Sequence, residues 1–141
     1  MLKKTGLIVV LLGFLSLLGL STAYARAAKP LLNPGPTAWG CTLSLSEVKK
    51  GIDTGLFVRE WTSSNAKTGY VQGKVVVRGK HTLVVDINYT ESSFEIKYKS
   101  SDNLKHSINS SGVEKIHPNA NSWMDNLNSS IVAALKSECS Q

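Results

Sequence analysis

The stretch that decides the fold is YVQGKVVVRGKHTLVVDINY, which spans Tyr70–Tyr89. Two runs rich in β-branched residues flank Arg78-Gly79-Lys80, a pattern typical of a β-hairpin. Apolar and polar side chains alternate within each run. One face of the hairpin is therefore apolar and the other is polar, so another part of the chain has to cover the apolar face.

More strands are expected on both sides of this hairpin. The segment SSFEIKYKS (Ser92–Ser100) alternates in the same way and predicts a further strand. Upstream, FVREWTS (Phe57–Ser63) predicts a first strand, with Phe57 and Trp61 on one side, and SSNAKTG (Ser63–Gly69) predicts a turn. Together these segments predict an antiparallel β-meander of three to four strands.

A helix is expected before the strands, within LSLSEVKKGIDTGLF (Leu43–Phe57). Ser44 is placed as an N-cap and Glu47 follows three residues later, which is the pattern of a capping box. Gly51 weakens the helix interior by about 1 kcal/mol relative to alanine. Gly55 suits the left-handed position at a helix C-terminus. The sequence predicts a short helix that needs tertiary packing to persist.

A second helix is expected from about Pro118 to Glu138. Its apolar residues recur at every fourth position, and they are Trp123, Leu127, Ile131 and Leu135. Two helices on one face of an antiparallel sheet make a two-layer sandwich. The predicted fold class is therefore α+β, with an N-terminal and a C-terminal helix on the same face of the meander.

The chain has two cysteines, Cys41 before the first helix and Cys139 after the second. In an oxidising compartment an even pair of cysteines indicates a disulfide. If the two helices are antiparallel, the start of the first meets the end of the second, and the two cysteines become neighbours. The alternatives are two free thiols or an intermolecular bridge.

Residues 1–25 have the pattern of a cleaved secretory signal peptide. Lys3 and Lys4 precede an almost wholly apolar run, Leu7–Leu20, and Ala23-Tyr24-Ala25 provides small residues for cleavage after Ala25. A transmembrane anchor is the competing interpretation, but this run is shorter than the roughly 18–20 residues that a spanning helix needs. A periplasmic or secreted protein is predicted.

The remaining chain divides into a Pro/Gly-rich leader, residues 26–40, and a single α+β domain, residues 41–141. The leader is expected to form no regular element. The formal net charge of the whole chain is +6, but the charges are scattered and form no basic arm, so nucleic acid is not an expected partner. No transmembrane span is expected in the mature chain.

Three motifs carry a resemblance to a known group of proteins. VRGKHTLVVDINY (Val77–Tyr89), FEIKYKSSDNL (Phe94–Leu104) and KIHPNANSWMDNL (Lys115–Leu127) together resemble a family of small secreted or lipid-anchored envelope proteins of proteobacteria. The resemblance covers about residues 48–135 and implies an exported α+β domain with no established activity. The chain departs from the family in having Ala120 where members commonly carry an aromatic, and in lacking a lipid-attachment cysteine.

A ligand site is hypothesised at the start of the second helix. The first turn of a helix presents free N–H donors that bind an anion or a carbonyl group, and the end of the last strand is expected to lie near it. A carbohydrate, a peptide or a small anion from the envelope suits such a pocket. The competing interpretation is structural, with His117 as the cap and Pro118 in the first turn. The candidate ligand-binding residues are Ser100, Ser101, Asn103, His117, Asn119 and Asn121.

Catalysis is not the favoured interpretation. No G-x-S-x-G elbow is present, and His81, His106 and His117 follow no recognised zinc spacing, so neither a metal nor a cofactor is predicted. Asp86 and Glu95 are expected to form ion pairs on the open face rather than a catalytic pair. The sequence predicts a non-catalytic binding module.

The alternative is a small secreted hydrolase, or an inhibitor of one. An inhibitor would display an exposed loop, and the two candidates are Ser63–Gly69 and His106–Gly112.

Overall fold

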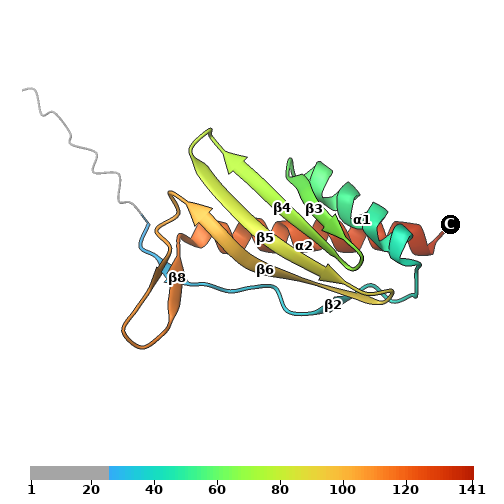
Figure 1. Cartoon of the computed structure of the whole chain (residues 1–141), viewed down its shortest axis with the longest axis horizontal. Coiled ribbons are helices and arrows are strands. Elements are labelled where there is room, and N and C mark those ends of the chain that lie inside the picture. The colour runs from blue at the N-terminus through green and yellow to red at the C-terminus, as the bar shows by residue number, and fades with distance from the viewer. Residues whose placement is uncertain (1–25) are drawn as a thin grey trace, which may run out of the picture.

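The hairpin of Tyr70–Tyr89 forms the centre of a five-stranded antiparallel sheet in the computed structural model, which describes residues 26–141. The predicted signal peptide lies outside the described residues. Two helices and a second, three-stranded antiparallel sheet complete the fold (Figure 1), so the α+β prediction is confirmed. The helices are α1, Leu45–Val58, and α2, Pro118–Cys139.

The larger sheet has the strand order β2-β6-β5-β4-β3, with β2 at Thr37–Ala38, β3 at Thr62–Lys67, β4 at Tyr70–Val77, β5 at His81–Tyr89 and β6 at Ser93–Asp102. The smaller sheet has the order β1-β8-β7, with β1 at Lys29–Pro30, β7 at Ser107–Ile108 and β8 at Glu114–Ile116.

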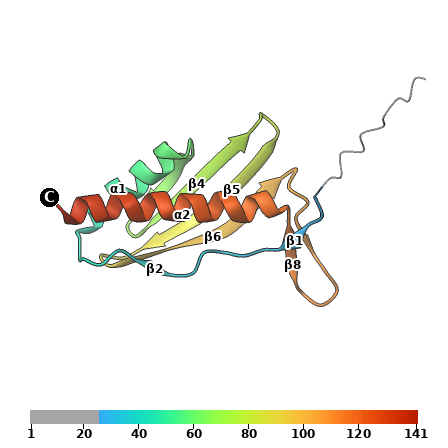
Figure 2. The same cartoon turned by 180° about the vertical axis from the view of Figure 1, so that it is seen from behind.

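The predicted alternation sets which face of the meander is buried. Val71 of β4 lies opposite Ile87 of β5, which lies opposite Ile96 of β6, and none of the three is exposed to solvent. Figure 2 shows α2 running along this sheet with α1 beside it. Met124, Leu127, Ile131 and Leu135 of α2 belong to the same buried cluster as these strand residues. The helices therefore cover the apolar face of the sheet, and the side chains of strands and helices form one core.

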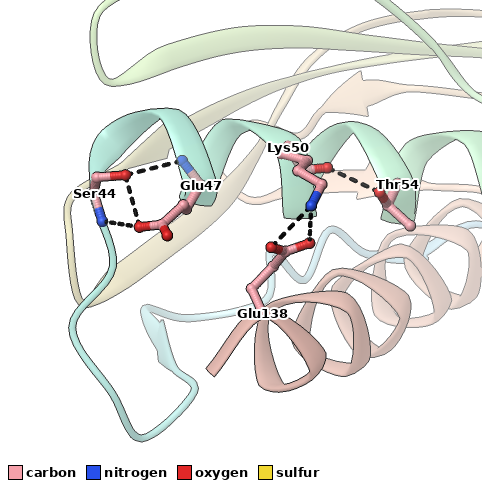
Figure 3. A network of polar contacts seen from close by, with 5 residues as sticks. All are labelled: Ser44, Glu47, Lys50, Thr54 and Glu138. Atoms are coloured by element: carbon pink, nitrogen blue, oxygen red, sulfur yellow. Dashed lines mark hydrogen bonds and ion pairs between the residues drawn. The ribbon is translucent and has the colours of Figure 1, made fainter. Parts of the chain in front are cut away.

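The predicted capping box at the start of α1 is confirmed (Figure 3). The backbone N–H of Glu47 donates to Ser44 Oγ over 3.3 Å, and Glu47 Oε2 accepts from the Ser44 backbone N–H over 2.8 Å. The hydrogen bonds from Ser44 hold the pKa of Glu47 below its usual value. One turn further on, Lys50 Nζ lies 3.0 Å from Glu138 Oε1 and links α1 to the end of α2.

The predicted boundary between the first helix and the first strand is wrong. Helix α1 continues to Val58, so Gly55 lies inside it rather than at a left-handed terminus, and Phe57 is helical and 82% exposed. Strand β3 begins only at Thr62 and occupies most of the predicted turn Ser63–Gly69. Packing of α1 against α2 stabilises this last helical turn. A tertiary contact of this kind cannot be predicted from local sequence preference.

Two glycines of α1 allow it to approach α2 closely. A Cβ at Gly55 would lie 2.8 Å from both the Cα and the backbone N of Ile131, and a Cβ at Gly51 would lie 2.5 Å from Leu135 Cδ2. The pairing of Gly51 with Leu135 and of Gly55 with Ile131 shows that the helices are antiparallel. Gly51 therefore serves helix packing, although it lowers the intrinsic stability of α1.

The predicted disulfide is confirmed. Cys41 and Cys139 are bonded, with their Cα atoms 6.1 Å apart. The bond joins the approach to α1 to the last residue of α2, as expected for antiparallel helices. It closes a loop with a sequence separation of 98 residues, which the chain-entropy model values at about 4–5 kcal/mol.

The Pro/Gly-rich leader is part of both sheets. Strand β1 pairs with β8 and β2 pairs with β6, which brings the larger sheet to one strand more than predicted. Trp39, just after β2, is only 4% exposed. Residues 26–40 therefore contain two short strands, although their composition predicted no regular element.

Within residues 26–141, neither helix combines the length and the apolar character that a bilayer crossing requires.

Gly55→Ala tests the close helix approach. Alanine raises helix propensity by about 1 kcal/mol, but its methyl group meets the backbone of Ile131, and overpacking of this kind costs typically 1–3 kcal/mol. We expect Gly55→Ala to lower the free energy of unfolding in urea. Gly51→Ala is the matched control, because its methyl group meets the flexible end of Leu135, and it should change stability by less than Gly55→Ala does. Greater stability of the Gly55→Ala variant would contradict this packing.

Candidate functional site

A half-enclosed cavity opens at the start of α2, and we call it the histidine cleft. Its volume is about 180 Å³. Side chains reach it from the β4–β5 hairpin, from the segment after β6 and from the first turns of α2. The lining residues are Val77, Arg78, His81, Leu104, His117, Asn119 and Trp123.

The cleft exists because the sheet is longer than its helical cover at this end. Val77 and His81 pair at the last position of the β4–β5 hairpin, on the face that holds the core, yet both are only half-buried. Helix α1 has already ended at Val58. Trp123 of α2 is also half-buried: it packs against the core, as its predicted place in the apolar stripe of α2 requires, and its exposed part lines the cleft.

The turn of the β4–β5 hairpin places Arg78 at the cleft. Arg78 and Gly79 have φ values of 54° and 67°, and the Lys80 N–H donates to the Val77 carbonyl over 3.2 Å. Positive φ at both central residues is typical of the type I′ turn, which matches the twist of a hairpin. Arginine rarely adopts this conformation. The geometry of the turn therefore holds Arg78 beside the cavity.

A kinked segment after β6 orients His81. Its Nδ1 lies 2.8 Å from the carbonyl oxygen of Asn103, which only accepts hydrogen bonds, so Nδ1 carries the proton. The Nε2 atom of the neutral ring is then an acceptor. Asn103 and Lys105 both have positive φ, and between them Leu104 turns inward to 2% exposure. The Asn103 side chain adds a 3.3 Å hydrogen bond to the Lys80 carbonyl.

His117 has the opposite tautomer. It is the N-cap of α2, and its Nδ1 accepts from the backbone N–H of Asn119 over 3.2 Å. The predicted cap and the predicted Pro118 at the first helical position are both confirmed. Because Nδ1 accepts, the proton of the neutral ring lies on Nε2, which is a donor. The two imidazoles therefore offer one acceptor and one donor nitrogen.

Burial lowers the pKa of His117, and the positive charges of Lys105 and Arg26, together with that of His81 when its ring is protonated, lower it further. The helix cap also needs the neutral ring, because protonation of Nδ1 would remove the acceptor for the Asn119 N–H.

A neutral His117 also makes a poor metal ligand at Nε2, because metal binding there would require the proton to move to Nδ1.

No carboxylate lines the histidine cleft. Across residues 26–141, no three or more His, Cys, Asp or Glu side chains are grouped as a metal ion would require. The lining offers one cation, one imidazole donor, one imidazole acceptor and one amide, and its positive charge favours an electron-rich group.

Only two of the six predicted site residues, His117 and Asn119, line the cleft. Asn103 supports it by holding His81. Asn121 is occupied elsewhere, because its Oδ1 accepts from the Leu32 N–H over 3.0 Å and its Nδ2 donates to the Pro30 carbonyl over 2.9 Å. It fastens the leader to α2.

The two predicted serines lie apart from the cleft lining. Ser101 Oγ is 2.9 Å from the hydroxyl of Tyr98, and Ser100 is exposed opposite Val84. The sequence interpretation also missed Arg78 and His81 as site residues, although the hairpin alternation puts His81 on the apolar face.

A broader hollow of about 400 Å³ lies on the open face of the sheet, beside Lys67, Tyr70 and Lys99. Here Asp86 accepts from the Tyr70 hydroxyl over 2.6 Å and from Lys99 Nζ over 3.2 Å. The hydrogen bond to Asp86 raises the pKa of Tyr70, and the same carboxylate raises that of Lys99. Asp86 is thus satisfied by its neighbours, and this hollow is more open than the histidine cleft.

His117→Asn tests the cap and its titration. The lowered pKa means that the unfolded chain binds more protons than the folded chain as the pH falls below about 6.5, so His117 makes the protein less stable toward acid. Asparagine caps a helix well and does not titrate near neutral pH. We expect the stability of wild type to fall relative to His117→Asn between pH 8 and pH 5 in urea unfolding. The control is His106→Asn, which leaves the cleft intact, and identical pH profiles for wild type and His117→Asn would refute the assignment.

Comparison of the chain with known protein families, with curated proteins and with solved structures finds no match. The geometry and chemistry of the histidine cleft therefore provide the basis for a functional proposal.

Proposed function

We propose that this chain is an exported, non-catalytic binding protein and that its ligand occupies the histidine cleft. The single observation that carries the proposal is the convergence of Arg78, His81, His117 and Asn119 on one half-enclosed cavity. Binding sites are typically concave, mainly apolar, and supplied with a few convergent polar groups. Val77, Leu104 and Trp123 supply the apolar walls here.

Two features favour export. The Cys41–Cys139 bond is of a kind that persists in oxidising compartments. Residues 1–25 have the sequence pattern of a signal peptide. We infer a periplasmic or secreted protein, consistent with the resemblance to small envelope proteins of proteobacteria. In the two-layer sandwich that we propose for the domain, the cleft lies where the helical layer stops short of the sheet.

The lining favours a ligand group that is negatively charged or rich in oxygen. Arg78 and the Nε2–H of His117 are donors, and Asn119 offers an amide beside them. Arg26 and Lys105 add positive charge close enough to lower the pKa of His117. A carboxylate, a phosphate or a carbohydrate hydroxyl cluster suits these donors, whereas an ammonium group does not.

The lining of the cleft supports binding rather than covalent catalysis. His81 Nδ1 and His117 Nδ1 are each used in a structural hydrogen bond, and no serine, threonine or cysteine lines the cleft as a nucleophile. A nucleophile within hydrogen-bonding reach of a base is the usual requirement for covalent catalysis.

NMR titration of the mature protein tests the proposal. We expect acetate, phosphate, envelope oligosaccharides or peptides to shift the imidazole resonances of His81 and His117 and the indole N–H of Trp123. Binding should weaken at least tenfold in Arg78→Gln, since one charged hydrogen-bond donor is lost. His106→Ala should bind as wild type does. If none of these compounds moves the cleft resonances, the proposal is wrong.

A second candidate function, inhibition of a secreted hydrolase, is favoured by one observation. The hairpin between β7 and β8 projects away from the five-stranded sheet (Figure 1), with Ile108 63% and Val113 43% exposed. Asn109 Oδ1 accepts from the N–H groups of Ser111 and Val113 and so rigidifies the tip. A preorganised loop binds at a lower entropic cost.

Assays of secreted hydrolases test this second candidate. We expect the wild-type protein to inhibit its target, Ile108→Ser to be at least tenfold weaker, and Ser110→Ala, which leaves the apolar tip residues in place, to remain equal to wild type. Absence of inhibition by the wild-type protein across the major hydrolase classes would eliminate this candidate.

A further inference from the structure

The histidine cleft continues into a second cavity of about 390 Å³, which we call the edge groove. The two share Val77, Arg78 and Trp123 as lining residues. On the far side, the edge groove is bounded by Val58 and Trp61. A groove with both apolar and polar lining therefore leads into the histidine cleft, with Arg78 at the junction.

The edge groove exposes apolar side chains to solvent. Val58 is 62% and Val76 is 51% exposed, and Trp123 is half-buried. Val76 alternates with the core-facing Val75 and Val77, so its side chain lies on the open face of the sheet, and its backbone forms the edge beside the groove. The polar members of the lining are two arginines, Arg59 and Arg78, with Glu60 and Asn126.

The floor of the groove is a strand edge without a neighbouring strand. Strand β3 begins at Thr62, opposite Lys74, whereas β4 continues to Val77, so Val75–Val77 pair only with β5 among the described residues. The Val77 carbonyl points toward β5, because it accepts a hydrogen bond within the β4–β5 turn. The Lys74 carbonyl points toward β3, because it accepts a hydrogen bond from Thr62 Oγ1. Because peptide groups alternate along a strand, the N–H and C=O of Val76 face the edge groove.

The N–H and C=O of Val76 decide which kind of ligand fits the edge groove. An acyl chain over Val76 would remove its N–H and C=O from water without supplying a partner, and an unsatisfied buried polar group costs free energy. An extended peptide satisfies both groups by strand addition and still presents apolar side chains to the groove. The open edge spans three residues, which is about 10 Å of strand.

We propose that the edge groove and the histidine cleft together bind the C-terminal end of an extended apolar peptide. The peptide runs parallel to β4 along Val76, and its terminal carboxylate lies at Arg78 and the Nε2–H of His117. The last and third-last side chains, which share one face of a strand, point toward Trp61 and Trp123. This inference rests on the proposed function and narrows its ligand to a peptide with a free C-terminus.

The test compares a ten-residue peptide ending in Val-Thr-Val as the free acid with the same peptide as the C-terminal amide. We expect the acid to bind and the amide to bind at least tenfold more weakly, because a charge-assisted hydrogen bond at Arg78 is lost. Arg78→Gln should reduce binding of the acid to the level of the amide. Lys80→Gln, a change of the same charge in the same turn but outside the lining of both cavities, should leave binding unchanged.

A second variant tests strand addition. Val76→Pro removes the N–H that faces the groove, and proline is tolerated on an edge strand where that N–H points to solvent. We expect Val76→Pro to weaken binding of the acid peptide and of the amide peptide alike. Unfolding of the variant is followed in parallel to confirm that its domain is folded. Equal binding of the acid and amide peptides, or unchanged binding to a folded Val76→Pro protein, would overturn the inference.

Acetate and decanoate separate this inference from the proposed function. If acetate shifts His81 and His117 but the acid peptide leaves Val58, Trp61 and Val76 unshifted, the peptide inference fails and the proposed function stands. Decanoate binding in the edge groove without peptide binding would also overturn it. If no carboxylate, phosphate, oligosaccharide or peptide shifts the cleft resonances, both proposals fail.

Discussion

Close contact between α1 and α2 is the constraint on which the rest of the structure depends. Gly55 has no Cβ where the backbone of Ile131 passes, and Gly51 leaves space for Leu135. The Cys41–Cys139 bond fixes the helices where α1 begins and α2 ends. With this register set, α1 ends at Val58 while the β4–β5 hairpin extends beyond it, so the Val77 end of the sheet is covered only by the first turns of α2. The cavities at this end follow directly from the mismatch in length.

The polar character of that end has a separate origin in backbone geometry. A helix that begins with His117-Pro118 needs an acceptor for the Asn119 N–H, and this need fixes one imidazole tautomer. The positive-φ segment Asn103–Lys105 brings a carbonyl to His81 and fixes the other tautomer. Two structural hydrogen bonds thus leave one donor and one acceptor nitrogen for a ligand. The structural and functional interpretations of His117 are therefore compatible.

Much of the fold was predictable because the responsible interactions are local. The Ser44–Glu47 capping box, the β4–β5 hairpin and the Pro118 helix start each depend on residues within a few positions of one another. The end of α1 and the role of the leader were not predictable in this way. Phe57 and Val58 have high β propensity and are largely exposed, yet they are helical because the contact of Gly55 with α2 and the burial of Leu56 hold the turn to which they belong. The two-residue strands β1 and β2 exist only because β8 and β6 lie beside them.

The sequence alone determined the apolar face of the meander and the two helices that flank it in the chain, and it favoured a bond between two cysteines that antiparallel helices would bring together. It also drew attention to the start of α2. Only the tertiary structure decided which side chains meet there, because His81 and Arg78 are separated from His117 by more than thirty residues and are joined to it through the packing of Leu104. The same packing assigned Asn121 to the leader, since the side chain of an asparagine satisfies whichever backbone groups the fold places beside it.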